Sequence, residues 1–281
     1  MFGRHKLRSR TDEQILLMRE AGLLTGRTLE MLRQRIRPGV TTLELDRLAE
    51  EFIRSHGGIP NFQLVAGYSH TLCTSVNDQV VHGIPSSSCV LREGDLLSID
   101  CGAEVRGWNG DSAISVVVGG PEAARPEDLD LIAATEASLY DGIAAMKVGG
   151  RLYDIGDAIE ASIDAAAERD RHTYGIIDEY VGHGIGEKMH LDPQIPNYAT
   201  GETGPRLVDG FTGAIEPMIT LGGTDTRVLA DDWTVVTADG SRACHFEHSV
   251  VVRDGGIWVL TALDGGQAAL EARGAPYAPL D

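Results

Sequence analysis

Asp100 and Asp111 each lie within a short apolar stretch whose composition predicts a β-strand. Gly107 between them suits a turn, and a tight hairpin centred between Val105 and Arg106 would place the two aspartates directly opposite each other. Their Cβ atoms would then lie roughly 4.5–5.5 Å apart on one face of the sheet. Two charges about 4 Å apart repel each other by about 4 kcal/mol at an effective dielectric constant of about 20. A folded protein avoids this energy by protonating one carboxylate, by exposing both, or by binding a cation between them.

A second pair of acidic residues occupies corresponding positions later in the chain. A shift of 116 residues places Glu216 on Asp100, and a longer shift places Glu247 on Asp111. If the two halves pack about a pseudo-twofold axis, the four carboxylates meet near that axis, and His183 adds an imidazole nitrogen. These ligands suit a pair of hard or borderline divalent ions, whereas a structural zinc site favours cysteine and is closed by four ligands. A two-metal site activates water near neutral pH and polarises a carbonyl, which is the chemistry of amide hydrolysis.

The helices and strands that must position these groups recur in the same order in both halves, as a duplication requires. In the first half, capping boxes at Thr11–Gln14 and Thr41–Glu44 each predict the start of a helix, and the second helix should end at Gly57-Gly58. In the second half, helices are predicted over about 126–147 and 153–168. Strands and turns follow each pair of helices.

The chain is therefore predicted to be of the α/β class, with one catalytic domain over residues 11–262 that contains two halves, 11–124 and 125–262. Residues 1–10 are basic and are expected to form a flexible tail. Residues 263–281 are rich in Gly and Ala and are expected to be frayed.

Composition excludes several classes of protein. The formal charge of −18 disfavours binding to DNA. No apolar run has the length of a membrane span, and no signal-peptide core is present. The four cysteines are widely spaced and form no C-x-x-C pair, which argues against a disulfide scaffold or a zinc ribbon and suits the reducing cytoplasm. The basic residues near the N-terminus suggest ribosomal RNA as a partner.

Six short motifs that include these residues follow one another along the chain. They are Val81-His82-Gly83-Ile84-Pro85, Ile99-Asp100-Cys101-Gly102, Gly107-Trp108-Asn109-Gly110-Asp111, Gly182-His183-Gly184-Ile185-Gly186, Ile215-Glu216-Pro217-Met218 and Phe246-Glu247-His248. In this order they are similar to the successive motifs of type I methionine aminopeptidases, over about residues 12–260. That resemblance implies the pita-bread fold, in which two pseudo-symmetric α/β halves surround a dinuclear metal site. It agrees with the internal repeat.

The resemblance implies that five residues bind two divalent metal ions: Asp100, Asp111, His183, Glu216 and Glu247. Asp111 and Glu247 would bridge the two ions. Asp100 would complete the ligands of one ion, and His183 with Glu216 those of the other. Sites rich in carboxylates accept Fe²⁺, Mn²⁺, Co²⁺ or Zn²⁺, so the residues leave the identity of the metal open.

The same resemblance implies roles for the residues around the metals. Glu216 would move a proton, His82 would act near the scissile nitrogen, and His190 would hydrogen-bond the substrate carbonyl. Five residues would line the methionine pocket: Tyr68, Cys73, Phe62, Met189 and Trp233. A role in the apolar core is the alternative for Cys73, Met189 and Trp233. The other histidines that we weighed, His70, His172, His245 and His248, are assigned structural roles.

The implied function is removal of the initiator methionine from nascent polypeptides when a small residue follows, by a monomer in the cytoplasm. One alternative is a proline-directed aminopeptidase of the same fold, against which the motif at His82 argues. Another is a non-catalytic pita-bread module that binds proteins. Such modules lose metal ligands, whereas all five positions here carry suitable residues. The glycines at 182, 184 and 186 do not have the spacing of a dinucleotide-binding loop.

Overall fold

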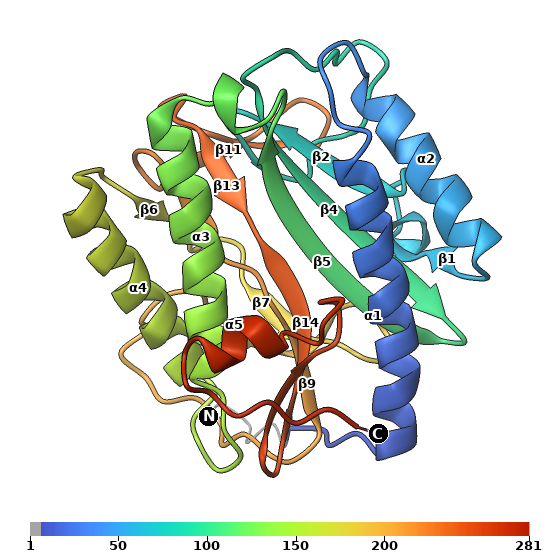
Figure 1. Ribbon diagram of the computed structural model, residues 1–281, viewed down its shortest axis with the longest axis vertical. Coiled ribbons are helices and arrows are strands. Elements are labelled where there is room, and N and C mark those ends of the chain that lie inside the picture. Colours follow the sequence, from blue (N-terminus) through green and yellow to red (C-terminus); the bar gives the residue numbers. More distant parts are fainter. Residues whose placement is uncertain (1–6, 281) are drawn as a thin grey trace.

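The computed structural model describes residues 7–280 and builds them around a curled nine-stranded sheet (Figure 1). Its main path runs through β1 (Ile59–Pro60), β4 (Leu96–Val105), β5 (Trp108–Val117), β14 (Glu247–Arg253), β9 (Phe211–Ile215), β7 (Gly182–Gly184) and β8 (Leu191–Ile195). β2 (Leu72–Val76) pairs with β4, and β15 (Gly256–Val259) pairs with β14. Two three-stranded sheets contain β13 (Ala243–His245), β10 (Met218–Thr220) and β6 (Gly175–Ile176), and β11 (Thr226–Val228), β12 (Val235–Thr237) and β3 (Gln79–Val81).

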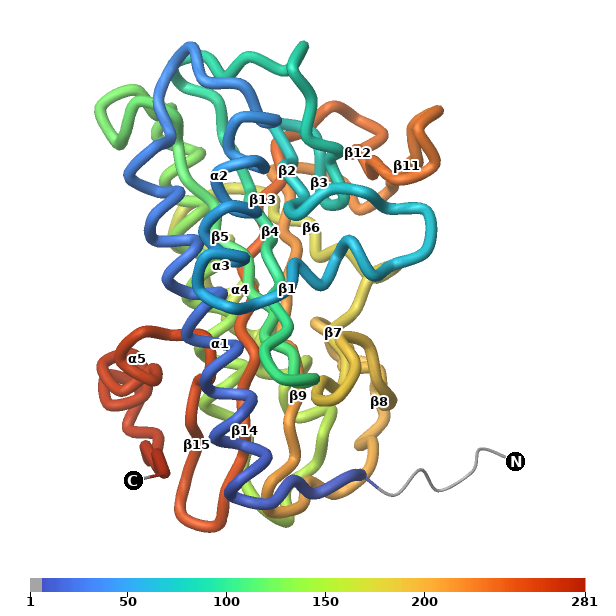
Figure 2. The backbone as a smooth tube through the Cα atoms, turned by 90° about the vertical axis from the view of Figure 1, so that its right-hand side faces the viewer, coloured from blue at the N-terminus to red at the C-terminus, as the bar shows by residue number. Residues whose placement is uncertain are grey.

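Four long helices cover one side of the large sheet, while short strands and loops lie on the other side (Figures 1 and 2). The helices are α1 (Asp12–Arg33), α2 (Thr42–Ser55), α3 (Pro126–Ala144) and α4 (Asp154–Asp170). α1 and α2 share a buried apolar cluster with β4, which includes Leu45 and Ile99. α3 and α4 share a second cluster with β9 and β14, which includes Leu131 and Ile215. None of the helices within residues 7–280 combines the length and apolar composition of a membrane-spanning segment.

Both predicted capping boxes are present. The Thr11 hydroxyl accepts a hydrogen bond from the Gln14 backbone N–H, and the Gln14 side chain accepts one from the Thr11 N–H. Thr41 and Glu44 make the same two bonds at the start of α2. Each box satisfies two backbone N–H groups that would otherwise lack a partner, so the predicted helix starts are confirmed.

The predicted hairpin through Asp100 and Asp111 is present, but its predicted register is wrong by two residues. Val105 pairs with Trp108, so the turn consists of Arg106-Gly107. Their φ angles are 52° and 81°. A two-residue turn with positive φ at both positions matches the twist of the flanking strands, and glycine adopts such angles without strain. The chemistry of this turn sets the register.

The observed register still places the two aspartates on one face of the sheet. Asp100 lies opposite Ala113, and Asp111 lies opposite Gly102. Side chains two residues apart on a strand point the same way, so the two carboxylates are diagonal neighbours instead of a direct pair.

The acidic residues of the second half lie where the two halves of the sheet meet. Glu216 falls between β9 and β10, and Glu247 begins β14. β14 pairs antiparallel with β5, and Glu247 lies opposite Ala113. Across this junction the Asp111 backbone N–H donates to Ser249 Oγ at 2.9 Å. The expected meeting of four carboxylates at the junction of the halves is therefore observed.

Residues 263–280 are packed, contrary to the expectation of a frayed end. α5 (Gln267–Glu271) lies in front of the sheet between α1 and α3 (Figure 1). Leu270 is fully buried, and Arg273 Nε donates to Asp141 Oδ1 at 2.6 Å. The glycines permit this contact, since a Cβ on Gly266 would lie 2.4 Å from Val259 Cγ2. The high content of Gly and Ala reflects close packing and not flexibility.

The part of the expected N-terminal tail that the structure describes is also packed. Leu7 is buried among residues of the second half, and the Arg10 backbone N–H donates to the Gly210 carbonyl at 2.8 Å. Arg8 stays exposed, with 66% of its side chain accessible, and Arg4, His5 and Lys6 lie outside the described residues.

Candidate active site

The five residues expected to bind metal come together at one cavity on the side of the sheet away from the long helices. Strand alternation explains this placement, because Ile99 and Cys101 point into the helix-covered cluster and Asp100 between them points the other way. Each residue comes from a different part of the sheet: Asp100 from β4, Asp111 from β5, His183 from β7, Glu216 from the link between β9 and β10, and Glu247 from β14. The site therefore forms only when both halves are folded together.

The donor atoms are close enough to share a cation. Ligand atoms of Asp111, His183 and Glu247 all lie within 4.8 Å of one another. The Glu216 carboxylate lies beside them, with Oε1 3.5 Å from His183 Nε2. His183 Nδ1 bonds to the Gly184 carbonyl at 3.0 Å, which directs the other ring nitrogen toward the cluster.

Several carboxylate oxygens in this cavity are buried without a hydrogen-bond partner. They are Asp100 Oδ1, Asp111 Oδ1 and Glu247 Oε1. Leaving a buried polar group unpaired costs about 1–3 kcal/mol, and more for a charged group. Buried oxygens with open lone pairs beside an imidazole nitrogen fit divalent cations, so the residues present match the metal site that the motifs predict.

Burial shifts the pKa values of the ionisable groups in this cluster. It raises the pKa of Asp100 to about 7. Burial also raises the pKa values of Asp111, Glu216 and Glu247 well above their ordinary range, and the neighbouring carboxylates raise them further. The pKa of His183 is lowered to about 4, mainly by burial and also by the His190 ring, so its imidazole is neutral and can act as a ligand.

These shifts predict that the metal-free protein loses stability as the pH rises above about 6.5. The folded carboxyls, whose pKa values are raised, hold protons that the unfolded chain has already lost near pH 4, and each such proton costs about 1.4 kcal/mol per pH unit in this range. The buried histidines, whose pKa values are lowered, make the stability rise with pH, but only below about pH 6.5. Thermal melting of metal-stripped protein should show a falling Tm across this range. Saturating Mn²⁺ should remove the slope, and a flat profile without metal would contradict the assignment.

The cavity extends from the acidic cluster into an apolar pocket. It encloses about 90 Å³, and at roughly 10–15 Å³ for each water this is room for six or more water-sized atoms. Every site residue proposed from the motifs lines it. The apolar part consists of Phe62, Val65, Tyr68, Cys73, Met189 and Trp233. A methionine side chain, with four heavy atoms and no branch, matches this space.

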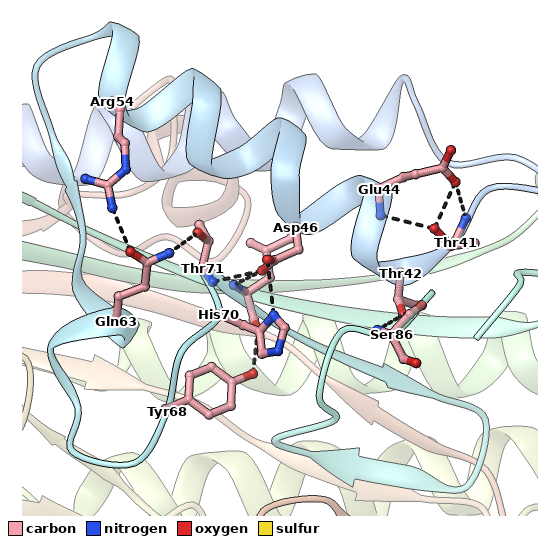
Figure 3. Close-up of polar contacts among 11 residues, drawn as sticks. Thr41, Thr42, Glu44, Asp46, Arg54, Gln63, Tyr68, His70, Thr71 and Ser86 are labelled. Carbon is pink, nitrogen blue, oxygen red and sulfur yellow. Dashed lines mark hydrogen bonds and ion pairs between the residues drawn. The ribbon is translucent and has the colours of Figure 1, made fainter. Parts of the chain in front are cut away.

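Helix α2 holds one wall of the pocket in place through Asp46 (Figure 3). Its buried carboxylate accepts hydrogen bonds from the backbone N–H groups of Thr71 and Leu72, at 2.8 and 2.9 Å. The Tyr68 hydroxyl donates to the Leu72 carbonyl at 2.6 Å. The Tyr68 ring packs against Trp233 with centroids 4.9 Å apart. This network fixes the loop that carries Phe62 and Tyr68.

Two further histidines, His82 and His190, line this cavity. His82, whose φ is 59°, packs edge-on against Tyr180 and Trp233. Burial lowers its pKa to about 4, so its ring is neutral at pH 7. The centroid of the His190 ring lies 4.5 Å from that of the His183 ring.

The sequence reasoning missed two residues near the site. Val65 lines the pocket, and its spacing of three residues from both Phe62 and Tyr68 was the available signal. His245 was assigned a structural role, yet its buried Nε2 has no hydrogen-bond partner and lies 3.9 Å from Glu216 Oε2. Its position only two residues before Glu247 could have indicated this.

The other three histidines that were assigned structural roles make contacts away from the cavity. His70 pairs with Asp46, and His172 pairs with Asp130. His248 contacts the hydroxyl groups of Tyr140 and Thr261 at 2.9 and 2.8 Å.

Comparisons with known proteins cover both halves of the chain. The model of metallopeptidase family M24 matches residues 16–254. Methionine aminopeptidase 1 of Mycobacterium tuberculosis is 48% identical over 259 residues, which is 92% of this chain and 96% of that protein. The methionine aminopeptidase of Clostridium acetobutylicum is 44% identical over 254 residues, which is 90% of this chain and 97% of that protein. The crystal structure of methionine aminopeptidase from Thermotoga maritima matches with a TM-score of 0.86 at 37% identity, over 91% of this chain and 99% of that chain.

Proposed function

The chain belongs to metallopeptidase family M24, and from this premise we propose which of its residues bind and cleave the substrate. It is a metal-dependent aminopeptidase that removes the initiator methionine from newly made proteins, and its fold is the pita-bread fold that the motifs imply. The predicted enzyme class and substrate are confirmed. The two alternatives, a proline-directed aminopeptidase and a non-catalytic binding module, receive no support from these relatives.

One observation supports the assignment of the cavity most directly. An apolar pocket with room for an unbranched side chain ends at a cluster of buried carboxylates. We propose that the pocket holds the methionine side chain and that the adjoining acidic cluster faces the free α-amino group and the first peptide bond. A substrate without a free N-terminus could not bring its peptide bond to this cluster, since the pocket admits only the first side chain.

We propose that the cluster holds two divalent ions. Asp100, Asp111, His183, Glu216 and Glu247 would hold them. When bound, the ions supply an activated water and polarise the scissile carbonyl. The open oxygens of Asp100, Asp111 and Glu247 and the neutral imidazole of His183 support this assignment.

Glu216 is the residue that we assign to proton transfer. Its carboxylate lines the cavity 3.5 Å from His183 Nε2, and burial beside Asp100 raises its pKa. His190, which also lines the cavity, would donate to the substrate carbonyl, and neutral His82 would hydrogen-bond at the scissile nitrogen. We attribute the preference for a small second residue to crowding between these two rings.

Methionine release from Met-Ala-Ser is the direct test of this function. Metal-stripped protein should release no methionine, and added Mn²⁺ or Co²⁺ should restore release. A peptide of the form Xaa-Pro should not be cleaved under the same conditions. Cleavage of Xaa-Pro in place of Met-Ala-Ser would overturn the proposed substrate, and no release with any metal from folded protein would overturn the proposed reaction.

Cys73→Leu is expected to raise KM for Met-Ala-Ser about tenfold or more, since a misfit of one methylene in an apolar pocket changes discrimination by about 10–200-fold. Cys73 is buried in the wall of a cavity of about 90 Å³, so the larger side chain takes space that methionine needs. Steady-state kinetics would measure the change, and Mn²⁺ affinity should stay the same. Cys89→Leu, at a half-buried cysteine outside the cavity, is the matched control.

We further propose that the chain acts as a monomer in the cytoplasm. The free state of all four cysteines supports a reducing compartment. Sedimentation velocity would test the monomer. Ribosome association through the basic N-terminal segment is a separate proposal, which cosedimentation of wild-type protein and an Arg4→Ala/Lys6→Ala variant would test.

A further inference from the structure

The segment from Gly186 to His190 contributes two side chains to the lining of the catalytic cavity. Met189 contributes to the apolar pocket, and His190 lies beside the metal cluster. The segment links β7, which carries His183, to β8. Its position therefore decides where both side chains meet the substrate.

On one side, Asn109 holds the start of this segment. The Asn109 backbone N–H and its Nδ2 both donate to the Gly186 carbonyl, at 2.9 and 3.0 Å. Asn109 belongs to β5, in the first half of the chain.

On the other side, the Arg10 side chain lies against the same segment. Arg10 Nη1 is 2.8 Å from Glu187 Oε2, and its Cζ lies 5.5 Å from the ring centroid of Trp108. The guanidinium group also fills the space beside Gly186, where a Cβ would lie 2.4 Å from Arg10 Nη2. Only 8% of the Arg10 side chain is exposed.

Arg10 is itself fixed by its main chain. Its backbone N–H donates to the Gly210 carbonyl at 2.8 Å, just before β9. Ser9 Oγ donates to the Asp209 carbonyl at 2.6 Å, and Leu7 is buried in the core of the second half. The guanidinium therefore projects from a fixed point onto the Gly186–His190 segment.

We propose that Arg10 is a positioning residue, which holds the Gly186–His190 segment so that Met189 and His190 meet the substrate correctly. This inference rests on the proposed function of the cavity. An ion pair whose acid is 39% exposed contributes little to stability. Its effect on catalysis is larger, because misplacing a group by about 1 Å can cost up to about 100-fold in rate.

Arg10→Ala is expected to lower kcat/KM for Met-Ala-Ser roughly tenfold, within the range that such misplacement produces. It should also lower the ratio of kcat/KM for Met-Ala-Ser to that for Leu-Ala-Ser, because a displaced Met189 leaves the pocket less selective. This ratio does not depend on how much of the protein is folded, so a purely structural defect would not change it. In metal-free protein, backbone amides at 186–190 should exchange hydrogen faster than in wild type.

Glu187→Ala should reproduce the loss in selectivity, and it alters only a partly exposed side chain. The double variant should be no worse than Arg10→Ala, since residues that act as a unit are not additive. Arg8→Ala is the matched control, because Arg8 pairs with the same carboxylate from a side chain that is 66% exposed. It should leave the ratio unchanged.

An unchanged ratio in both Arg10→Ala and Glu187→Ala, beside active wild-type protein, would overturn the inference. An equal loss in Arg8→Ala would also overturn it, because surface charge would then explain the effect. If wild-type protein itself released no methionine with any metal, the proposed function of the cavity would fail instead.

Discussion

Glu216→Gln is expected to lower kcat for Met-Ala-Ser by roughly 10²–10⁴-fold, the range typical of losing a general acid or base. The amide has nearly the same shape as the carboxyl group, but it cannot take up and return a proton. Glu216 lines the cavity, and its carboxylate oxygens lie 3.5 Å from His183 Nε2 and 3.9 Å from His245 Nε2. Steady-state kinetics at saturating Mn²⁺ would measure the loss.

The bound metal must be counted in the same sample, since Glu216 is also a proposed ligand. If kcat falls while the metal content stays near that of wild type, the loss comes from proton transfer and not from loss of metal. Glu202→Gln, on an exposed loop, is the matched control and should keep wild-type kinetics. A Glu216→Gln variant that retained more than about a tenth of wild-type kcat would contradict the proton-transfer role, since that role is worth about 10²-fold or more.

Asp111→Asn is expected to weaken Mn²⁺ binding by more than the roughly 10–100-fold that follows loss of a partner outside the ligand set. Asp111 lies at the centre of the cluster, within 4.8 Å of donor atoms of both His183 and Glu247. An amide contributes a neutral oxygen where the proposed site has a charged ligand. Titration calorimetry would measure the affinity, and methionine release at micromolar Mn²⁺ should be lost.

The same substitution should stabilise the metal-free protein. Above about pH 7 it removes one of several buried carboxyls that burial and mutual repulsion destabilise, so the Tm should rise by a few degrees, given about 2–4 °C per kcal/mol for domains of this size. The gain should shrink as the pH falls toward 6.5, because holding a proton that the unfolded chain has lost costs less free energy at lower pH. Asp178→Asn, at an exposed position, should change neither quantity. Lower metal-free stability at pH 8 would argue that Asp111 has a structural role instead.

The helix starts and the identities of the proposed site residues could be predicted from the sequence alone. A capping box is complete within four residues, as at Thr11–Gln14, so no distant contact is needed to predict it. The two halves repeat their elements in the same order, which predicted that Asp100, Asp111, Glu216 and Glu247 would meet. All of the proposed site residues do line one cavity.

The register of the central hairpin required the structure. The alternation of strand residues placed Asp100 and Asp111 on one face correctly, because that face depends only on odd or even spacing. Their direct opposition was wrong, since the turn falls at Arg106-Gly107 and moves the pairing by two residues. Composition marked a turn but did not distinguish between two neighbouring positions for it.

What the sequence determined by itself was the chemistry and its order along the chain: which side chains can bind metal, and which helices and strands precede them. The packing of the two ends of the chain and the contacts that hold the pocket walls could be seen only in the tertiary structure. The Gly and Ala content of segment 263–280 predicted flexibility, yet these small residues allow α5 to lie close to the sheet. Likewise, the basic residue Arg10 reads as part of a solvated tail, yet it packs between Glu187 and Trp108. The physical reason is sequence separation, because hydrogen bonds within a few residues are specified locally, whereas burial depends on surfaces that meet only when the whole chain has folded.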